Sequence, residues 1–295
     1  MEAEIQAAEI DAPLEILMPE RQRLPLVVAS PHSGSTYPPD FVAASRLDRL
    51  TLRRSEDCFV HDLFDAAPRL GAPLIRALFP RAYVDPNREP FELDPAMFRD
   101  ELPAYVNSRS PRVAAGLGTL ARVVANGAEI YQRKLSFAEA MERLRDCYWP
   151  YHQALRRLID ETVQRFGYCI LIDCHSMPSA GGPGDLDQGP STVDIVLGDN
   201  HGTACAPQVM ETATEALASE GMTVTRNTPY SGGFVTRHYG RPAQAVHALQ
   251  IEINRSLYMD EERILRGPGL PVLADRMGRL VAALAGIEPR CFEAA

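Results

Sequence analysis

The stretch that decides the fold is ILIDCHSMP, residues 170–178. Its branched aliphatic residues are typical of a buried strand, and the pattern predicts one over residues 168–173. Polar residues follow at once: Asp173, Cys174 and His175 stand where a glycine or asparagine would be enough to end a strand. Ionisable side chains at this position raise the question of what partners the rest of the chain brings to His175.

Predicted strands and helices alternate along the rest of the chain. Further strand-like runs lie at residues 24–30, 73–78, 81–84, 193–197, 222–226 and 245–253. Helical patterns lie at residues 57–70, 136–166, 203–219 and 271–285. Pro150 falls inside the longest helical pattern, so we expect two helices or a sharp kink near Trp149. Residues 91–130 and the Gly- and Pro-rich residues 178–190 are predicted to be irregular.

This alternation predicts an α/β fold, with a twisted, mixed but mostly parallel sheet flanked by helices on both faces. No linker, repeat or low-complexity segment divides the chain. We therefore expect a single domain over residues 1–295, in which residues 1–23 form an irregular extension.

The composition excludes several classes of protein. With 295 residues, 45% of them hydrophobic, the chain can bury a sizeable core. A net charge of -9 argues against nucleic-acid or membrane partners, so an anionic ligand would need a local cluster of arginines. No apolar run is long enough to span a membrane, and the acidic N-terminus with its Pro13 does not resemble a secretory signal. Six cysteines without a CxxC pair fit reduced thiols in a cytoplasmic protein.

Polar residues collect at the carboxyl ends of the predicted strands, where open α/β sheets bind their ligands. Glu252 lies inside the strand 245–253 and points to the face opposite its neighbours Ile251 and Ile253, if that strand is regular. The other polar residues at strand ends are His32, Asp85, Asn87, Arg88, Asp173 and His175.

Two histidines and one carboxylate, with a fourth position open to water, make a catalytic zinc site. His32 and His175 would supply the nitrogen ligands, and Glu56 or Asp57 the carboxylate. Zinc would acidify a bound water and polarise the carbonyl under attack. Glu252 could then transfer the proton, and Arg88 could hold a substrate carboxylate through two parallel hydrogen bonds.

Each of these residues also has a purely structural interpretation. A single histidine near a strand end is more often structural, and acids such as Glu56 and Asp57 favour the first turn of a helix. Arg88 could simply pair with Asp85 or Glu89. Asp173 could be an ordinary strand-end acid or could orient a metal-binding histidine. Cys174 points away from its two neighbours and is predicted to pack in the core.

Seven blocks of sequence, taken together, resemble the N-formylglutamate amidohydrolase (deformylase) family. They cover residues from about 25 to 265, whereas the first two dozen residues and the segment 92–125 match poorly. In family order the blocks are SPHSG (30–34), SEDCFVHDLFD (55–65), VDPNR (84–88), WPYHQALRR (149–157), FGYCILIDCHSMPS (166–179), GGFVTRHYGRP (232–242) and HALQIEINRSLYMDE (247–261).

The resemblance implies a fold like that of the zinc carboxypeptidases and the same order of site residues. It places one zinc ion per chain on His32, Asp57 and His175, and it favours Asp57 over Glu56 because related sequences keep the aspartate. Manganese or cobalt could occupy the same ligands. His32 and Asp57 are 25 residues apart, which departs from the carboxypeptidase pattern, in which the first two ligands lie within one turn. The other implied residues are catalytic Glu252 and Arg88, with Asn87 at the substrate.

The block TRHYG (236–240) also matches the family. Arg237 would supply a second cation for a dianionic substrate, with His238 as a hydrogen-bonding partner. Equally, these residues could form a tight loop in which they only hold one another.

The implied activity is hydrolysis of the formyl amide of N-formyl-L-glutamate to formate and glutamate, a late step of histidine degradation. One alternative is a zinc hydrolase of another N-acyl amino acid, or of a γ-glutamyl or peptide-like amide. A second, of a different class, is a non-catalytic binder of acidic metabolites that needs no zinc. The expected partner is a small acidic substrate, and the sequence does not predict the oligomeric state.

Overall fold

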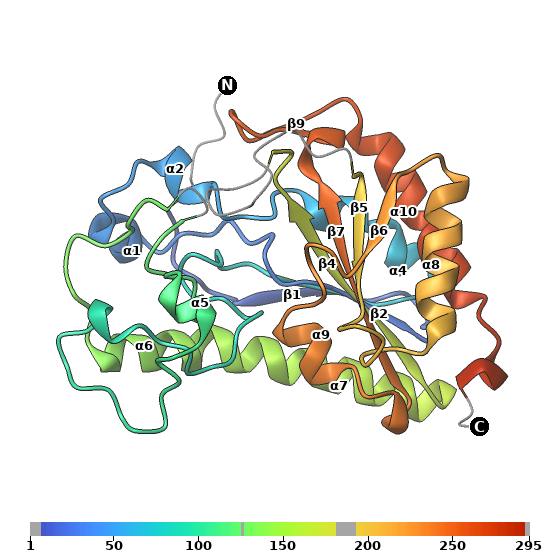
Figure 1. The fold of residues 1–295 in the computed structure, drawn as a ribbon, viewed down its shortest axis with the longest axis horizontal. Coiled ribbons are helices and arrows are strands. Elements are labelled where there is room, and N and C mark those ends of the chain that lie inside the picture. The colour runs from blue at the N-terminus through green and yellow to red at the C-terminus, as the bar shows by residue number, and fades with distance from the viewer. Residues whose placement is uncertain (1–6, 125–126, 181–192, 293–295) are drawn as a thin grey trace.

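The computed structural model describes residues 7–124, 127–180 and 193–292. Its main sheet has the strand order β1-β3-β2-β4-β7-β5-β6 (Figure 1). Strands β3, β2, β4 and β7 run parallel, β1 and β5 are antiparallel to their neighbours β3 and β7, and β6 is parallel to β5. The predicted mixed, mostly parallel sheet is therefore confirmed. The strands are β1 Leu14–Leu17, β2 Leu26–Ser30, β3 Leu74–Ala77, β4 Cys169–Met177, β5 Ile195–Gly198, β6 Val224–Arg226 and β7 Val246–Asn254, with a separate pair, β8 Met259–Asp260 and β9 Leu265–Arg266.

Strand β4 lies at the centre of the sheet and is buried along its whole length. Its side chains alternate between two cores: Ile170 and Ile172 contribute to one, and Leu171 to the other. Asp173 and His175 continue the Leu171 face beyond the apolar part of the strand. The strand therefore delivers Asp173 and His175 to one face, at the carboxyl end of the sheet.

Helices cover both faces of the sheet, as predicted. The long helix α7 packs on the face that contains Leu171, and α3, α4, α8 and α10 pack on the opposite face (Figure 1). The helices are α1 Pro39–Ala44, α2 Arg49–Arg53, α3 Val60–Leu63, α4 Ala66–Leu70, α5 Pro111–Ala114, α6 Phe137–Arg143, α7 Trp149–Phe166, α8 Pro207–Ser219, α9 Phe234–Tyr239 and α10 Leu270–Ala285.

The interruption expected near Trp149 takes the form of a π-helical turn, Leu144–Tyr148, between α6 and α7. Pro150 consequently lies in the first turn of α7, where a helix tolerates proline. Ser136 caps α6 through a reciprocal pair of hydrogen bonds with Glu139, which fixes where the helical segment begins.

Three predictions about local structure are wrong. Residues 81–84 form a turn rather than a strand, because the backbone N–H of Tyr83 donates to the carbonyl of Pro80 at 2.9 Å. The helix predicted over 57–70 is divided into α3 and α4. The extension 1–23 is not irregular throughout, because β1 pairs with β3 and its Glu15 accepts a 2.6 Å hydrogen bond from Arg76.

Other predictions concern what the chain lacks. None of the helices within the described ranges is long and apolar enough to cross a membrane. All six cysteines lie in described segments and carry free thiols, as the sequence predicts. The loop predicted over 178–190 falls mostly outside the described residues.

Candidate metal centre

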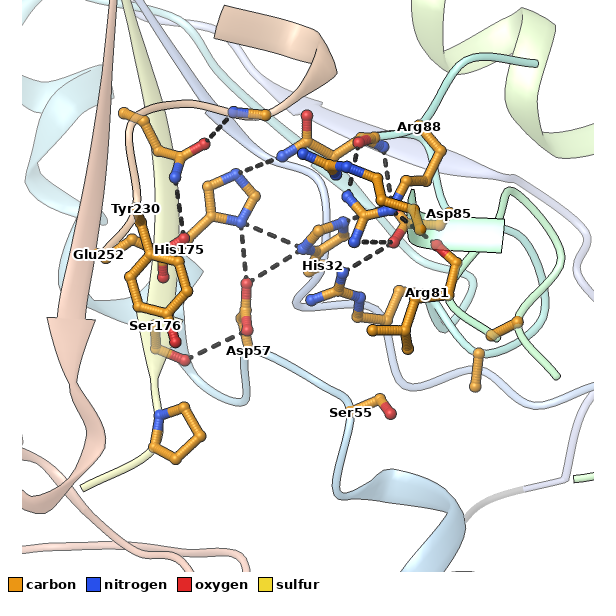
Figure 2. A pocket seen from close by; sticks show the side chains of 18 of the residues that line it. His32, Ser55, Asp57, Arg81, Asp85, Arg88, His175, Ser176, Tyr230 and Glu252 are labelled. Carbon is orange, nitrogen blue, oxygen red and sulfur yellow. Dashed lines mark hydrogen bonds and ion pairs between the residues drawn. The ribbon is translucent and has the colours of Figure 1, made fainter. Parts of the chain in front are cut away.

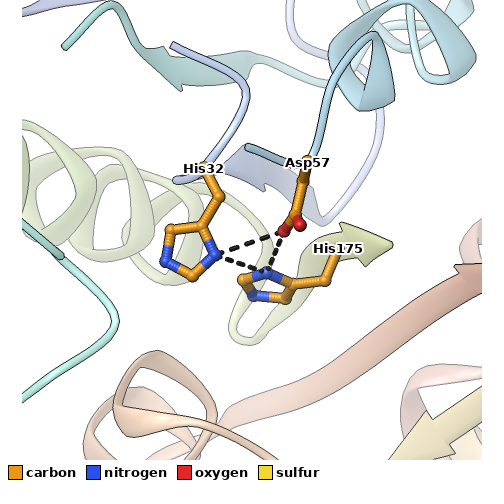
Figure 3. A group of neighbouring side chains, drawn as sticks. All are labelled: His32, Asp57 and His175. Carbon is orange, nitrogen blue, oxygen red and sulfur yellow. Dashed lines mark hydrogen bonds and ion pairs between the residues drawn. The ribbon is translucent and has the colours of Figure 1, made fainter. Parts of the chain in front are cut away.

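Three side chains that are remote in sequence meet at the carboxyl end of the sheet (Figure 3). The Nδ1 atoms of His32 and His175 lie 3.1 Å apart, and Asp57 Oδ2 lies 3.2 Å from the first and 3.0 Å from the second. Bonds of about 2.0–2.1 Å from a tetrahedral zinc ion would place neighbouring ligand atoms about 3.3 Å apart. The three atoms therefore form a nearly equilateral triangle of the size that one face of such a site requires.

Short connections at strand ends position these ligands. His32 lies two residues beyond the end of β2, and its backbone carbonyl accepts a 3.0 Å hydrogen bond from the N–H of Asp57. His175 lies near the end of β4. Glu56, the alternative ligand, points elsewhere: its carboxylate accepts hydrogen bonds from Arg53 Nη2 at 2.9 Å and from the Tyr37 hydroxyl at 2.6 Å. Of the two acids, Asp57 is thus the one that faces the histidines.

Each histidine ring also contacts an aspartate through Nε2, the ring nitrogen that faces away from the centre. His32 Nε2 lies 2.7 Å from Asp85 Oδ1, and His175 Nε2 lies 3.0 Å from Asp173 Oδ1. A carboxylate only accepts, so Nε2 of each ring carries the proton and Nδ1 presents its lone pair to the centre. Two lone pairs and a carboxylate oxygen so close together form a set of donors that a cation would fit.

The electrostatics of the centre favour a positive charge. Burial alone would raise the pKa of Asp57, but the neighbouring rings of His175 and His32 hold it well below its usual range. Burial opposes charge on His175 as well, yet Asp173 raises the pKa of that imidazole well above its ordinary value. The same field that favours a proton favours a divalent cation, so the residues present fit a metal ion.

Glu252 faces the centre from the neighbouring strand. It is paired in register with His175 across β4 and β7, so both side chains emerge on the same face (Figure 2). Its Oε1 accepts a 2.9 Å hydrogen bond from Gln250, and its other oxygen has no partner in the described segments. Burial raises the pKa of Glu252 to about 7, with the charge of His175 opposing the shift and that of Asp57 adding to it.

Asn87 connects the centre to α9. Its Nδ2 lies 3.1 Å from His175 Nε2, and its Oδ1 accepts a 2.7 Å hydrogen bond from the backbone N–H of Val235. The backbone of Gly233 lies against this amide, and a Cβ at position 233 would overlap it. The backbone N–H of Gly233 also donates to Gln250 at 2.7 Å, so the same loop orients the partner of Glu252.

A cavity of about 400 Å³ opens over the three ligands (Figure 2). This volume is in the usual range for small-molecule sites. Glu252 and Asn87 line the cavity together with the ligands, and so do four arginines: Arg81, Arg88, Arg112 and Arg255. A local cluster of arginines is the feature that a chain of net charge -9 needs in order to bind an anion.

Three of these arginines have partners. Arg81 pairs with Asp85 at 2.8 Å and Arg255 with Asp57 at 3.2 Å. Arg88 donates to the carbonyls of Asn87 at 2.8 Å and Leu117 at 2.9 Å, and its Nη2 lies 3.8 Å from Asp85. Burial lowers the pKa of Arg88 to about 10, so the side chain remains charged at neutral pH.

Comparison with known proteins decides the family. The family described as N-formylglutamate amidohydrolase matches residues 24–259. The chain belongs to this family. It is 31% identical to the N-formylglutamate deformylase of Pseudomonas aeruginosa, over 84% of this chain and 87% of that protein. It is 30% identical to the N-formylglutamate deformylase of Pseudomonas putida, over 84% and 86% of the two chains.

Solved structures agree with this family assignment. The N-formylglutamate amidohydrolase from Ralstonia eutropha JMP134 superimposes with a TM-score of 0.84 at 37% identity, over 93% of this chain and 97% of that one. A gene product of Agrobacterium tumefaciens shares the fold with a TM-score of 0.66 at 18% identity, over 92% and 94% of the two chains. The resemblance seen in the sequence and the predicted class, an amidohydrolase acting on a linear amide, are both confirmed for the family.

Two of the residues suggested by the resemblance to this amidohydrolase family lie apart from the cavity. Arg237 is exposed and its Nε donates to the carbonyl of Gly233 at 3.2 Å. His238 stacks on Phe234, with ring centroids 4.8 Å apart, and its Nε2 lies 3.5 Å from Arg156. Neither side chain lines the cavity above the three ligands.

The sequence of this amidohydrolase did not predict the roles of Asp85, Arg255 and Arg112 at the site. Asp85 stands in the family block VDPNR, but its contact with His32 spans 53 residues and no local spacing predicts it. Arg255 follows Glu252 by three residues and stands directly after the end of β7 at Asn254, a position at the same edge of the sheet. Arg112 lies in the poorly matching segment 92–125, and no pattern there singles it out.

The partner of His32 gives a first prediction. Replacing Asp85 with asparagine is expected to weaken the binding of a metal ion such as zinc by about 10–100-fold. The neutral amide lacks the negative charge that raises the basicity of the His32 ring, and it can turn its NH2 group toward Nε2 instead of its oxygen. Competition with a chromogenic zinc chelator measures the affinity. Asp65→Asn, which removes an exposed carboxylate paired with Arg69, is the control and should leave the affinity unchanged. Equal affinity in the Asp85 variant would contradict this role.

Proposed function

We propose that this protein is a zinc-dependent deformylase that hydrolyses N-formyl-L-glutamate to formate and L-glutamate, a step late in histidine degradation. One observation carries the proposal: the group His32, Asp57 and His175 lines the same cavity as Glu252 and a cluster of arginines. One carboxylate oxygen of Glu252 has no hydrogen-bond partner among the described residues. The names of the relatives from Pseudomonas support the substrate.

A zinc ion held by His32, Asp57 and His175 would supply a water of lowered pKa and polarise the formyl carbonyl. Glu252 is the residue that handles protons. Its free oxygen accepts a proton from the attacking water and delivers it to the leaving nitrogen of glutamate, which departs as an amine. A carboxyl pKa raised toward neutrality suits both transfers.

The arginines position the substrate. N-formylglutamate carries two carboxylates, and its single amide must lie over the metal group for the reaction to occur. Arg88 is the best placed for one carboxylate, because it follows Asn87, which contacts His175, and approaches Asp85, which contacts His32. Fixing the carboxylate there holds the formyl carbon in register with the catalytic groups, which lowers the entropic part of the barrier.

The test is direct. Purified protein is incubated with N-formyl-L-glutamate, and formate and glutamate are quantified before and after exhaustive chelation, and again after zinc, manganese or cobalt is returned. We expect equimolar products, loss of turnover on chelation and recovery with metal. No formate from the metal-loaded protein would overturn the substrate assignment, and full turnover after complete metal removal would overturn the metal-dependent reaction.

A further inference from the structure

Among the four arginines that line the cavity, Arg112 stands apart. It lies on the short helix α5 and its side chain is half-buried. Its guanidinium forms no hydrogen bond or ion pair with any residue in the described ranges, whereas Arg81, Arg88 and Arg255 all have such partners. A half-buried cation that faces a ligand cavity without a partner is available to an anion from solution.

The surroundings of Arg112 reinforce this availability. Burial and the nearby charges of Arg237 and Arg81 lower its pKa, while Asp85 and Glu92 act in the opposite direction without pairing with it. The four arginines of the cavity outnumber its three carboxylates, Asp57, Asp85 and Glu252, even before a divalent cation is added. An anionic group beside Arg112 would therefore reduce an excess of positive charge.

The segment that carries Arg112 is fixed with respect to Arg88. Ser110 caps α5 by accepting a 3.1 Å hydrogen bond from Val113 N, and Val113 is buried. A few residues on, the carbonyl of Leu117 accepts the 2.9 Å hydrogen bond from Arg88 Nε. The N–H of Thr119 donates to the carbonyl of Glu92 at 2.8 Å. These hydrogen bonds hold the segment that carries Arg112 in a fixed position relative to Arg88. Arg88 lies close to the metal ligands, and Arg112 lies on α5.

The geometry points to Arg112 as the residue that binds the side-chain carboxylate of the substrate and selects N-formyl amino acids with a second negative charge. This assignment rests on the proposed function and extends it to specificity. In N-formylglutamate the α-carboxylate is two carbons closer to the formyl group than the side-chain carboxylate is. Arg88 lies next to Asn87, which contacts His175, and near Asp85, which contacts His32. Arg88 accordingly binds the α-carboxylate, and Arg112 binds the side-chain carboxylate.

The experiment compares Arg112→Gln with the unmodified protein on N-formyl-L-glutamate and on N-formyl-L-glutamine, which replaces the distal carboxylate by a neutral amide of the same shape. For the glutamate substrate we expect kcat/KM to fall by about 10–100-fold, mainly through KM, because a charge-assisted hydrogen bond is lost. For the glutamine substrate it should change by less than about threefold, since a neutral amide gains little from the cation. Arg112→Lys should lie between the two proteins on the glutamate substrate, because it keeps the charge but not the planar fork.

Arg109→Gln is the matched control: it makes the same change of charge at an exposed position outside the cavity, and it should alter neither substrate. Calorimetric titration with glutarate and with its monoamide provides a readout independent of turnover, and we expect Arg112→Gln to abolish the preference for glutarate. Equal losses on both formyl substrates, or no change on either, would overturn the assignment. If the wild-type protein releases no formate but prefers glutarate over its monoamide, and Arg112→Gln removes that preference, the deformylase activity is refuted and the role of Arg112 stands. If the wild-type protein shows no preference for glutarate, the role of Arg112 is refuted.

Discussion

Replacing Glu252 with glutamine will lower kcat for N-formyl-L-glutamate by about 10²–10⁴-fold and leave the metal bound, because general acid–base catalysis contributes that much. The substitution keeps the shape of the side chain and its hydrogen bond with Gln250, but removes the oxygen that can take up a proton. Glu252 contributes none of the atoms of the His32, Asp57 and His175 group, so the metal content should not change.

The pH profile separates this role from a structural one. Without metal, burial holds the pKa of Glu252 at about 7, and a cation would lower it by offsetting the charge of Asp57. The carboxylate is the active form, so kcat of the unmodified enzyme should fall as the pH drops through this pKa. The Glu252→Gln variant should lose that acidic limb, and Glu262→Gln, at an exposed position, should retain it. A glutamine variant with more than a tenth of the activity and the same acidic limb would rule out this role for Glu252.

Replacing His175 with alanine will remove turnover to the level of the uncatalysed reaction and reduce the metal content from one ion per chain to almost none. The variant loses one of the three ligand atoms found in the described part of the chain, and a divalent cation bound by His32 and Asp57 alone has too few protein ligands for a stable site. Elemental analysis after gel filtration and a formate assay check the two parts. His201→Ala, at an exposed position outside the site, is the control.

Thermal unfolding gives an independent view of the same centre. A metal ion present at a hundred times its dissociation constant stabilises the folded protein by about 2.7 kcal/mol. Chelation should therefore lower the melting temperature of the wild-type protein and leave that of the His175→Ala variant almost unchanged. Because this measurement uses the unmodified chain, it remains informative even if the variant folds poorly. An identical melting temperature with and without metal would show that the cation does not bind here.

The sequence predicted most of what is local in this structure. The apolar run at 170–172 identified the central strand, and the spacing of Asp173 and His175 placed both on one face of it. Glu252 was likewise predicted to leave its strand on the face opposite the apolar residues at 251 and 253, and these two do pack in the opposite core. Such features follow from the two-residue period of a strand alone.

What could not be predicted depends on contacts between distant segments. Nothing in the spacing of residues pairs His32 with Asp85, and no periodicity marks Arg112 within an irregular segment. Residues 81–84 have a strand-like composition, but the hydrogen bond from the N–H of Tyr83 to the carbonyl of Pro80 closes a turn there instead. The resemblance to a family, rather than any single motif, singled out Asp57 over Glu56 before the structure showed where each carboxylate lies.

Gly233 bears on how variants of this enzyme should be interpreted. Its φ of -83° is available to any amino acid, so the backbone does not demand a glycine there. The demand comes from the amide of Asn87, which occupies the volume that a methyl group would need. A change as small as alanine would thus displace the side chain of Asn87, which contacts the imidazole of His175 on β4. In a natural relative with a larger residue at this position, we expect either a different residue in place of the contact between Asn87 and His175 or loss of the hydrolytic activity.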